Sequence, residues 1–151
     1  MEPTDTQITV GWRERVDLPD WRVRGIRAKI DTGARTSAVH VDHIEEVEDG
    51  HLRFAVVVRQ RPSVRLRWVT APLVRESVVK PSSGVRQRRP VVLTTLSLGG
   101  VAAEIELSLV CRREMLCRML VGRTALAGRY LVDASQTYLV SAARKGGGRT
   151  A

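Results

Sequence analysis

Apolar and polar residues alternate along much of this chain, and a period of two is the spacing of side chains on one face of a β-strand. The alternation is most regular over residues 101–110, where one face consists of Ala103, Ile105, Leu107 and Leu109. Residues 64–68 repeat the pattern with Val64, Leu66 and Trp68, and residues 26–30, 54–59 and 91–98 are apolar runs of strand-forming type. This pattern excludes a helical bundle and predicts a fold built from strands.

Turn-forming residues separate these runs, as expected for many short strands in one sheet system. They are Glu48-Asp49-Gly50, Arg61-Pro62-Ser63, Pro81-Ser82-Ser83-Gly84 and Gly99-Gly100. The sequence therefore predicts an all-β barrel or sandwich. One short helix is expected over residues 123–127, because Gly128 would end it.

The 151 residues predict one domain over residues 8–141, with flexible termini at residues 1–7 and 144–151. No apolar run is long enough to span a membrane, and residues 1–7 contain no apolar segment of a secretory signal. Cys111 and Cys117 are too few for a disulfide framework or a cysteine-rich zinc site. We expect no membrane partner and a cytoplasmic location.

The formal charge of +9 would attract polyanions. No nucleic-acid-binding motif accompanies this charge, and one Phe and two Tyr leave little for base stacking. A solvated strand face explains the arginines better, so we expect no nucleic-acid partner. The arginines in question are Arg53, Arg59, Arg61, Arg65 and Arg67.

The tripeptide Asp31-Thr32-Gly33 occurs once, after the apolar Ile30 and before Ala34. Alone it is compatible with an ordinary Asx turn. It is also how an aspartic protease presents its carboxylate, with Gly33 offering its N–H and Thr32 a small hydroxyl. Such an enzyme needs two coupled carboxylates, and this chain has no repeat that could supply the second. A homodimer with the active site on its two-fold axis is then required.

Two further segments agree with this reading. Residues 119–126 read Met-Leu-Val-Gly-Arg-Thr-Ala-Leu, and between the two motifs residues 78–90 could form a hairpin with its tip at Pro81 to Gly84. The order of catalytic loop, flap and Gly-plus-helix resembles that of retroviral proteases. In those proteins the Gly-Arg segment closes the loop through which the Asp-Thr-Gly strand passes.

A closer resemblance rests on Val10 to Glu14, Lys29 to Ala38, Ser82-Ser83-Gly84 and Met119 to Leu126. These phrases resemble a bacterial retropepsin-like family that is often labelled an ATP-dependent zinc protease and is associated with RimK-type glutamate ligases. The resemblance covers residues 8–141 and implies a retropepsin-like closed β-barrel with aspartic peptidase activity. It implies a catalytic role for Asp31, Thr32 and Gly33, and a structural one for Gly122 and Arg123. The implied substrate-binding residues are Ala34, Arg35, Ser82, Ser83 and Gly84.

The residues do not support the ATP and zinc of that label, so we expect no cofactor and no metal. A phosphate-binding Gly-x-x-x-x-Gly-Lys loop and a His-Glu-x-x-His motif are both missing. His40-Val41-Asp42-His43 fits no standard zinc spacing, and surface positions are expected for its histidines and for His51. Small apolar packing is expected of the two cysteines, and core or interface positions of Trp12, Trp21 and Trp68. Asp133 lacks a following Thr-Gly and is not expected to be the second carboxylate.

Arginines near the catalytic loop and the flap point to an acidic peptide substrate, although ordinary solvated charges fit equally well. They are Arg35, Arg86, Arg88 and Arg89. The family's association with glutamate ligases favours glutamylated tails. The leading hypothesis is a homodimeric aspartic endopeptidase. The alternatives are a non-catalytic module of the same fold that binds acidic tails and, more weakly, a basic nucleic-acid-binding barrel.

Overall fold

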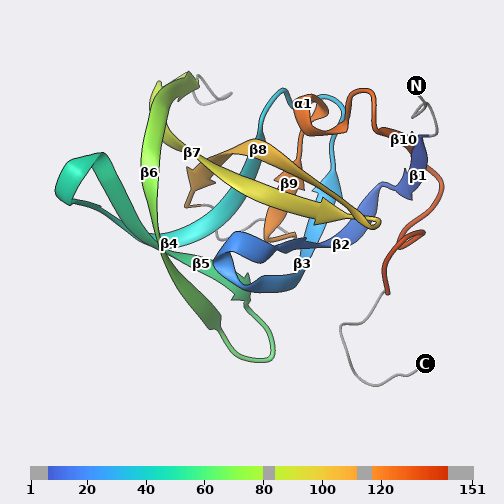
Figure 1. Ribbon diagram of the computed structural model, residues 1–151, viewed down its shortest axis with the longest axis horizontal. Coiled ribbons are helices and arrows are strands. Elements are labelled where there is room, and N and C mark those ends of the chain that lie inside the picture. The colour runs from blue at the N-terminus through green and yellow to red at the C-terminus, as the bar shows by residue number, and fades with distance from the viewer. Residues whose placement is uncertain (1–6, 80–83, 112–116, 143–151) are drawn as a thin grey trace.

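The computed structural model describes residues 7–79, 84–111 and 117–142 (Figure 1). Ten strands and one short α-helix follow one another in these residues, so the all-β expectation is confirmed. The strands are β1 Ile8–Gly11, β2 Arg13–Leu18, β3 Val23–Ile30, β4 Ser37–Val47, β5 His51–Arg59, β6 Arg65–Val79, β7 Gln87–Leu98, β8 Val101–Val110, β9 Met119–Val121 and β10 Tyr130–Asp133. The helix α1 is Arg123–Leu126, and two 3-10 turns are η1 Pro19–Trp21 and η2 Glu48–Gly50.

Eight strands form one sheet in the order β2-β3-β9-β4-β5-β6-β7-β8. Additional pairings of β2 with β7 and of β4 with β8 close this sheet into a ring. Its inner residues form one apolar core around Phe54, Leu107, Met119 and Ile26. Trp21 contributes to this core with an edge-on contact to Phe54, at 5.3 Å between ring centroids.

The remaining two strands join the two ends of the described chain. β1 and β10 pair in parallel, from Ile8 opposite Tyr130 to Gly11 opposite Asp133. The carboxylate of Glu14, which is fully buried, strengthens this junction. It accepts hydrogen bonds from the N–H of Gly11 at 2.7 Å, the N–H of Leu139 at 2.8 Å and the hydroxyl of Ser141 at 2.6 Å. The segment after β10 is thereby tied to the start of the sheet.

The strand β9 lies between β3 and β4. It runs parallel to β3, with Ile30 opposite Val121, and antiparallel to β4, with Ala38 opposite Leu120. The residues between β3 and β4, which include Asp31, therefore pass around the end of β9. This is the arrangement that the resemblance to retroviral proteases implied for the Gly122 segment.

The structure confirms most of the predicted strands and the helix. One alternating apolar pattern, however, lies on the surface and not in the core. Val64, Leu66 and Trp68 alternate as a buried face would, yet their exposed fractions are 59%, 37% and 44%. The core contacts of β6 come from Val69 and Ala71 instead. Trp68 is thus not a core residue; its ring stacks on His43 and lies under the Arg53 guanidinium.

None of the helices in the described ranges is both long and apolar enough to cross a membrane.

Candidate active site

Asp31 directly follows β3, whose last residue Ile30 is buried and anchors the strand. Backbone hydrogen bonds hold this strand end on both sides. The N–H of Ile30 donates to the carbonyl of Trp12 at 2.8 Å, and the N–H of Asp31 donates to the carbonyl of Val121 at 2.9 Å. Asp31 is therefore positioned by β9 and by the link between β1 and β2.

The carboxylate of Asp31 is oriented by its own loop. The Gly33 N–H donates to Asp31 Oδ1 at 2.9 Å, and the Ala34 N–H donates to the Asp31 carbonyl at 3.3 Å. Asp31 itself is half-buried, whereas Thr32 and Gly33 are exposed. The orientation of the Asp31 carboxylate is thus fixed, and the loop around it lies on the surface of this chain.

The segment β9–α1 clamps the loop that carries Asp31. The N–H of Arg123 donates to the Ala34 carbonyl at 2.7 Å, and Thr124 donates its N–H at 3.2 Å and its hydroxyl at 2.9 Å to the Arg35 carbonyl. The guanidinium of Arg123 also reaches the Gly33 carbonyl at 3.2 Å. Arg123 thus binds the backbone of the Asp31 loop through both its N–H and its side chain.

Gly122 is the point of closest approach between the clamp and the loop. A Cβ built on it would lie 2.8 Å from the carbonyl carbon of Thr36, 2.9 Å from the oxygen of Ala34 and 3.0 Å from that of Arg35. Its N–H donates to the buried Ser37 hydroxyl at 3.0 Å. The structural role predicted for Gly122 therefore has a steric cause.

A hollow of about 260 Å³ lies beside the Asp31 loop. It is lined by Arg35 and Thr36 of the loop, Arg75 of β6, Glu104 and Glu106 of β8, and α1. Arg75 Nη2 is paired with Glu106 Oε1 at 2.6 Å, across the base of the β6–β7 hairpin. The Arg35 guanidinium has no hydrogen-bond or ion-pair partner in the described part of the chain.

The predicted flap corresponds to the outer end of the β6–β7 hairpin, where Val79 pairs with Gln87 and Ser77 with Arg89 (Figure 1). Gly84 has a φ of +86° and open space around it. Ser82 and Ser83 lie outside the described residues. Among the flap arginines, Arg88 pairs with Glu76 at 3.4 Å, and Arg89 donates to Gln87 at 3.3 Å.

The remaining candidates do not gather at this site. His40 is buried in β4, which contradicts the surface position expected for it, while His43 stands on the bulge after Asp42 with a φ of 58°. Within the described ranges no three His, Cys, Asp or Glu side chains are grouped as metal ligands would be. Cys117 is buried as expected, whereas Cys111 is exposed and donates its thiol hydrogen to the Val41 carbonyl at 3.1 Å.

Asp133 is also engaged away from the loop. Its carboxylate accepts hydrogen bonds from the Ser135 hydroxyl at 2.7 Å and the Ser135 N–H at 2.9 Å. These bonds favour the charged form and lower the pKa of Asp133. Asp133 is a turn residue at the end of β10, in keeping with its rejection as a second catalytic carboxylate.

Sequence reasoning missed three residues that hold the site. Ser37, Thr124 and Glu14 each satisfy backbone groups distant in sequence, and their residue types alone give no sign of it. The sequence around Glu14 contained a usable signal, because Glu14 alternates with Arg13 and Arg15 on a short strand and therefore faces the opposite side, together with the apolar Val16.

The comparisons with known proteins agree with this geometry. The profile of a family described as RimB-like, retropepsin-like aspartic endopeptidase RimB, matches residues 9–143. A probable alpha-L-glutamate ligase of Shewanella pealeana is 31% identical over 138 residues, which are 89% of this chain and 30% of that protein. One of Parasynechococcus marenigrum is 34% identical over 131 residues, covering 84% of this chain and 28% of its own length. This chain thus spans less than a third of these curated relatives.

Among solved structures, a Legionella pneumophila protein of unknown function, assigned to DUF785, superposes with a TM-score of 0.72 at 25% identity. The match covers 90% of this chain and all of that one.

Proposed function

The chain belongs to the RimB-like family of retropepsin-like aspartic endopeptidases, and we propose that two copies of it hydrolyse peptide bonds with one Asp31 from each. The observation that carries this proposal is the geometry of the loop. The Asp31 carboxylate is oriented by the Gly33 N–H at 2.9 Å, and it stands on an outward-facing loop clamped by β9 and α1. A carboxylate held in this way is suited to meet its symmetry mate.

The proposed chemistry needs two carboxylates in different protonation states. The ionised Asp31 takes a proton from water as its oxygen attacks the scissile carbonyl carbon, and the protonated Asp31 of the second copy donates to the carbonyl oxygen. The carbon–nitrogen bond then breaks as the amine nitrogen receives a proton. Thr32 and Gly33 keep the loop small at the point where the two copies would meet.

We propose an acidic peptide as substrate. Its support is the unpartnered Arg35 guanidinium beside the loop, because an arginine recognises a carboxylate through two parallel hydrogen bonds. Arg75 is already satisfied by Glu106, so it contributes little unless that pair opens. The names of the curated relatives, probable alpha-L-glutamate ligases, favour glutamyl peptides. Cys111 and Cys117 are not joined in a disulfide, which fits the reducing cytoplasm as the proposed place of action.

The deciding experiment compares wild-type protein with Asp31→Asn and with the matched control Asp133→Asn. Hydrolysis of glutamate-rich peptides should fall roughly 10²- to 10⁴-fold in Asp31→Asn, because a catalytic acid or base of this kind contributes that much. Asp133→Asn should keep its activity, and sedimentation should find both variants in the same assembly as wild type. Peptide cleavage that is unchanged in Asp31→Asn contradicts the assignment.

A second candidate function is a non-catalytic module that holds acidic tails on the same fold. It is favoured by the single Asp-Thr-Gly per chain together with the free Arg35 guanidinium. This function predicts binding of glutamate-rich peptides by a stable monomer, with no hydrolysis by wild-type protein at any concentration.

A further inference from the structure

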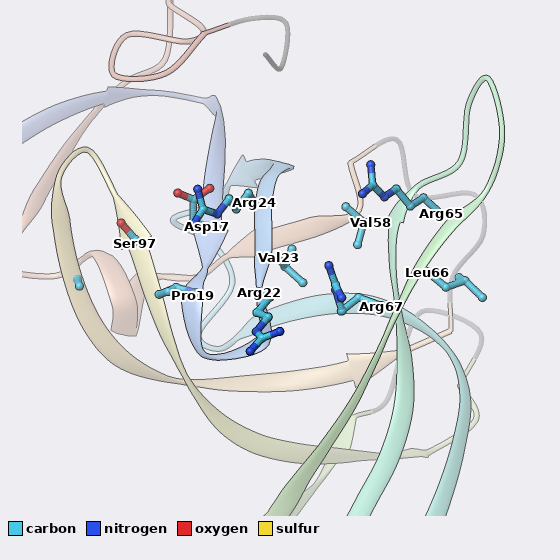
Figure 2. A pocket seen from close by; sticks show the side chains of 11 residues that line it. Asp17, Pro19, Arg22, Val23, Arg24, Val58, Arg65, Leu66, Arg67 and Ser97 are labelled. Atoms are coloured by element: carbon cyan, nitrogen blue, oxygen red, sulfur yellow. The ribbon is translucent and has the colours of Figure 1, made fainter. Parts of the chain in front are cut away.

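A second and larger hollow, of about 670 Å³, lies where three hairpins meet (Figure 2). The β2–η1–β3 hairpin lines it with Asp17, Pro19, Val23 and two arginines. The β5–β6 hairpin contributes Val58, Leu66 and two more arginines. The strands β7 and β8 contribute Ser97 and Ala102. Val23 and Arg24 begin β3, whereas Asp31 follows its end, so about seven residues, or roughly 20 Å of strand, separate this hollow from the candidate active site.

Four of the charged residues that line this hollow are arginines. Arg22, Arg24, Arg65 and Arg67 all border the hollow, and Figure 2 shows Arg22 and Arg67 coming from opposite walls, with Val23 lying between them. Asp17 is the single carboxylate in the lining, and its oxygen is occupied by the Gly25 N–H at 2.7 Å. Like charges gathered in this way repel each other unless an anion lies among them.

These guanidiniums are left without partners by the rest of the described chain. Ion pairs there involve Arg53, Arg75 and Arg88, none of which lines the hollow. None of Arg22, Arg24, Arg65 and Arg67 donates a side-chain hydrogen bond to a described residue. Arg22 in addition has a left-handed backbone with a φ of 58°, which residues other than glycine rarely adopt. The four arginines are exposed and border one hollow, and each guanidinium can form two parallel hydrogen bonds to a carboxylate.

The residues of β6 that border the hollow, Arg65 to Arg67, belong to a stretch with one open strand edge. β6 pairs with β5 from Arg65 to Pro72, but it pairs with β7 only from Leu73 onward. Over Arg65 to Ala71 no described strand pairs with the other edge of β6, and Pro72 ends this open stretch. An open edge offers backbone N–H and carbonyl groups to an added extended chain.

We propose that this hollow binds an acidic peptide segment in extended conformation, which adds to the open edge of β6 and places its carboxylates on Arg22, Arg24, Arg65 and Arg67. Nucleic acid fits less well, because no aromatic side chain in the lining could stack on a base. The site is separate from Asp31 and does not depend on the proposed hydrolysis.

Binding should therefore be measured on the Asp31→Asn protein, where no cleavage can interfere. The probe is a fluorescent peptide of alternating Glu and Thr, as long as the open edge, followed by anisotropy. The double variant Arg22→Gln, Arg67→Gln should weaken binding about tenfold or more, since two charge-assisted contacts are lost. The matched control Arg53→Gln, Arg59→Gln removes equal charge from the same protein outside the hollow and should change the affinity by less than about threefold.

Two further probes test the shape and class of the ligand. The same peptide with alternate backbone nitrogens methylated keeps its carboxylates but cannot pair with β6, so it should bind at least about tenfold more weakly. A single-stranded RNA of equal charge should bind weakly and without dependence on Arg22 and Arg67. The proposal is overturned if the peptide does not bind, if both arginine pairs matter equally, if methylation has no effect, or if the RNA binds as tightly as the peptide with the same dependence.

Discussion

At the scale of single residues, the Asp31 loop is held through its backbone carbonyls rather than through ion pairs. Arg123 and Thr124 donate to the carbonyls of Gly33, Ala34 and Arg35, and these bonds form only because the two backbones approach closely at Gly122. A side chain at Gly122 would meet carbonyl groups that cannot move away like the end of a flexible side chain. The position of Asp31 therefore depends on the absence of a side chain at Gly122, which directly follows the neighbouring strand β9.

We expect Gly122→Ala to destabilise the protein by about 2–4 kcal/mol, because overpacking against backbone displaces the loop or the start of α1. Urea unfolding followed by tryptophan fluorescence measures this loss, and peptide hydrolysis should fall with it. The control is Gly50→Ala, where a Cβ has nothing within 4 Å and only the φ of +71° opposes it. That variant should cost about 1 kcal/mol, and an equal cost for the two would contradict the steric role of Gly122.

At the scale of elements, the sequence predicts the regular strands well and the joining elements poorly. The 101–110 alternation matches β8, and the helix predicted over 123–127 is α1 at Arg123–Leu126. β1 and β10 have four residues each and lie near opposite ends of the chain, where they pair in parallel. No local sequence pattern predicts such a pairing. The hydrogen-bond partner of the Arg123 side chain could not be predicted either. Every residue has a backbone carbonyl, so the sequence does not indicate which one Arg123 contacts.

The β6 strand shows why alternation alone can mislead. The pattern of Val64, Leu66 and Trp68 has the period of a strand, but the period does not state which face is inside. In the structure Arg67 lies opposite the buried Val56 and Leu66 opposite the buried Val57, yet Leu66 and Trp68 are themselves exposed. Arg65 and Arg67 are exposed, as expected for a solvated strand face, and they also border the hollow between the hairpins.

Glu14 joins elements that are far apart in sequence. Its replacement should therefore destabilise the segment after β10 as well as β2. Glu14→Gln replaces an acceptor that serves Gly11, Leu139 and Ser141 with a group whose NH₂ end faces N–H donors. We expect a loss of about 2–4 kcal/mol in stability, since hydrogen bonds to a buried charge are lost and donors are left unsatisfied.

Hydrogen exchange should find the amides of Leu139 and Val140 less protected in this variant. The control Glu104→Gln changes an exposed carboxylate of β8 and should stay within about 0.5 kcal/mol of wild type. If both variants unfold at the same urea concentration as wild type, the buried carboxylate is not what holds the segment after β10.

At the scale of the whole molecule, each copy would contribute half of an active site and a complete arginine-lined hollow. The Asp31 loop and the hollow lie at opposite ends of β3, so a dimer formed around Asp31 leaves both hollows accessible. Such a dimer makes the proposed activity depend on concentration, whereas binding in the hollow belongs to each chain alone. The two proposals can thus fail separately.

Mixing wild-type protein with Asp31→Asn tests the shared site directly. If subunits exchange at random in an equal mixture, roughly one quarter of the dimers contain two intact Asp31 residues, and activity should fall to about that fraction of the undiluted wild type. An enzyme with one independent site per chain would keep about half. Activity followed across several mixing ratios should therefore vary as the square of the wild-type fraction, and a straight line through the same points contradicts a dyad built from two chains. Activity should stay at the wild-type level at every mixing ratio when Asp133→Asn replaces Asp31→Asn as the added variant, since its own Asp31 remains available to complete a site.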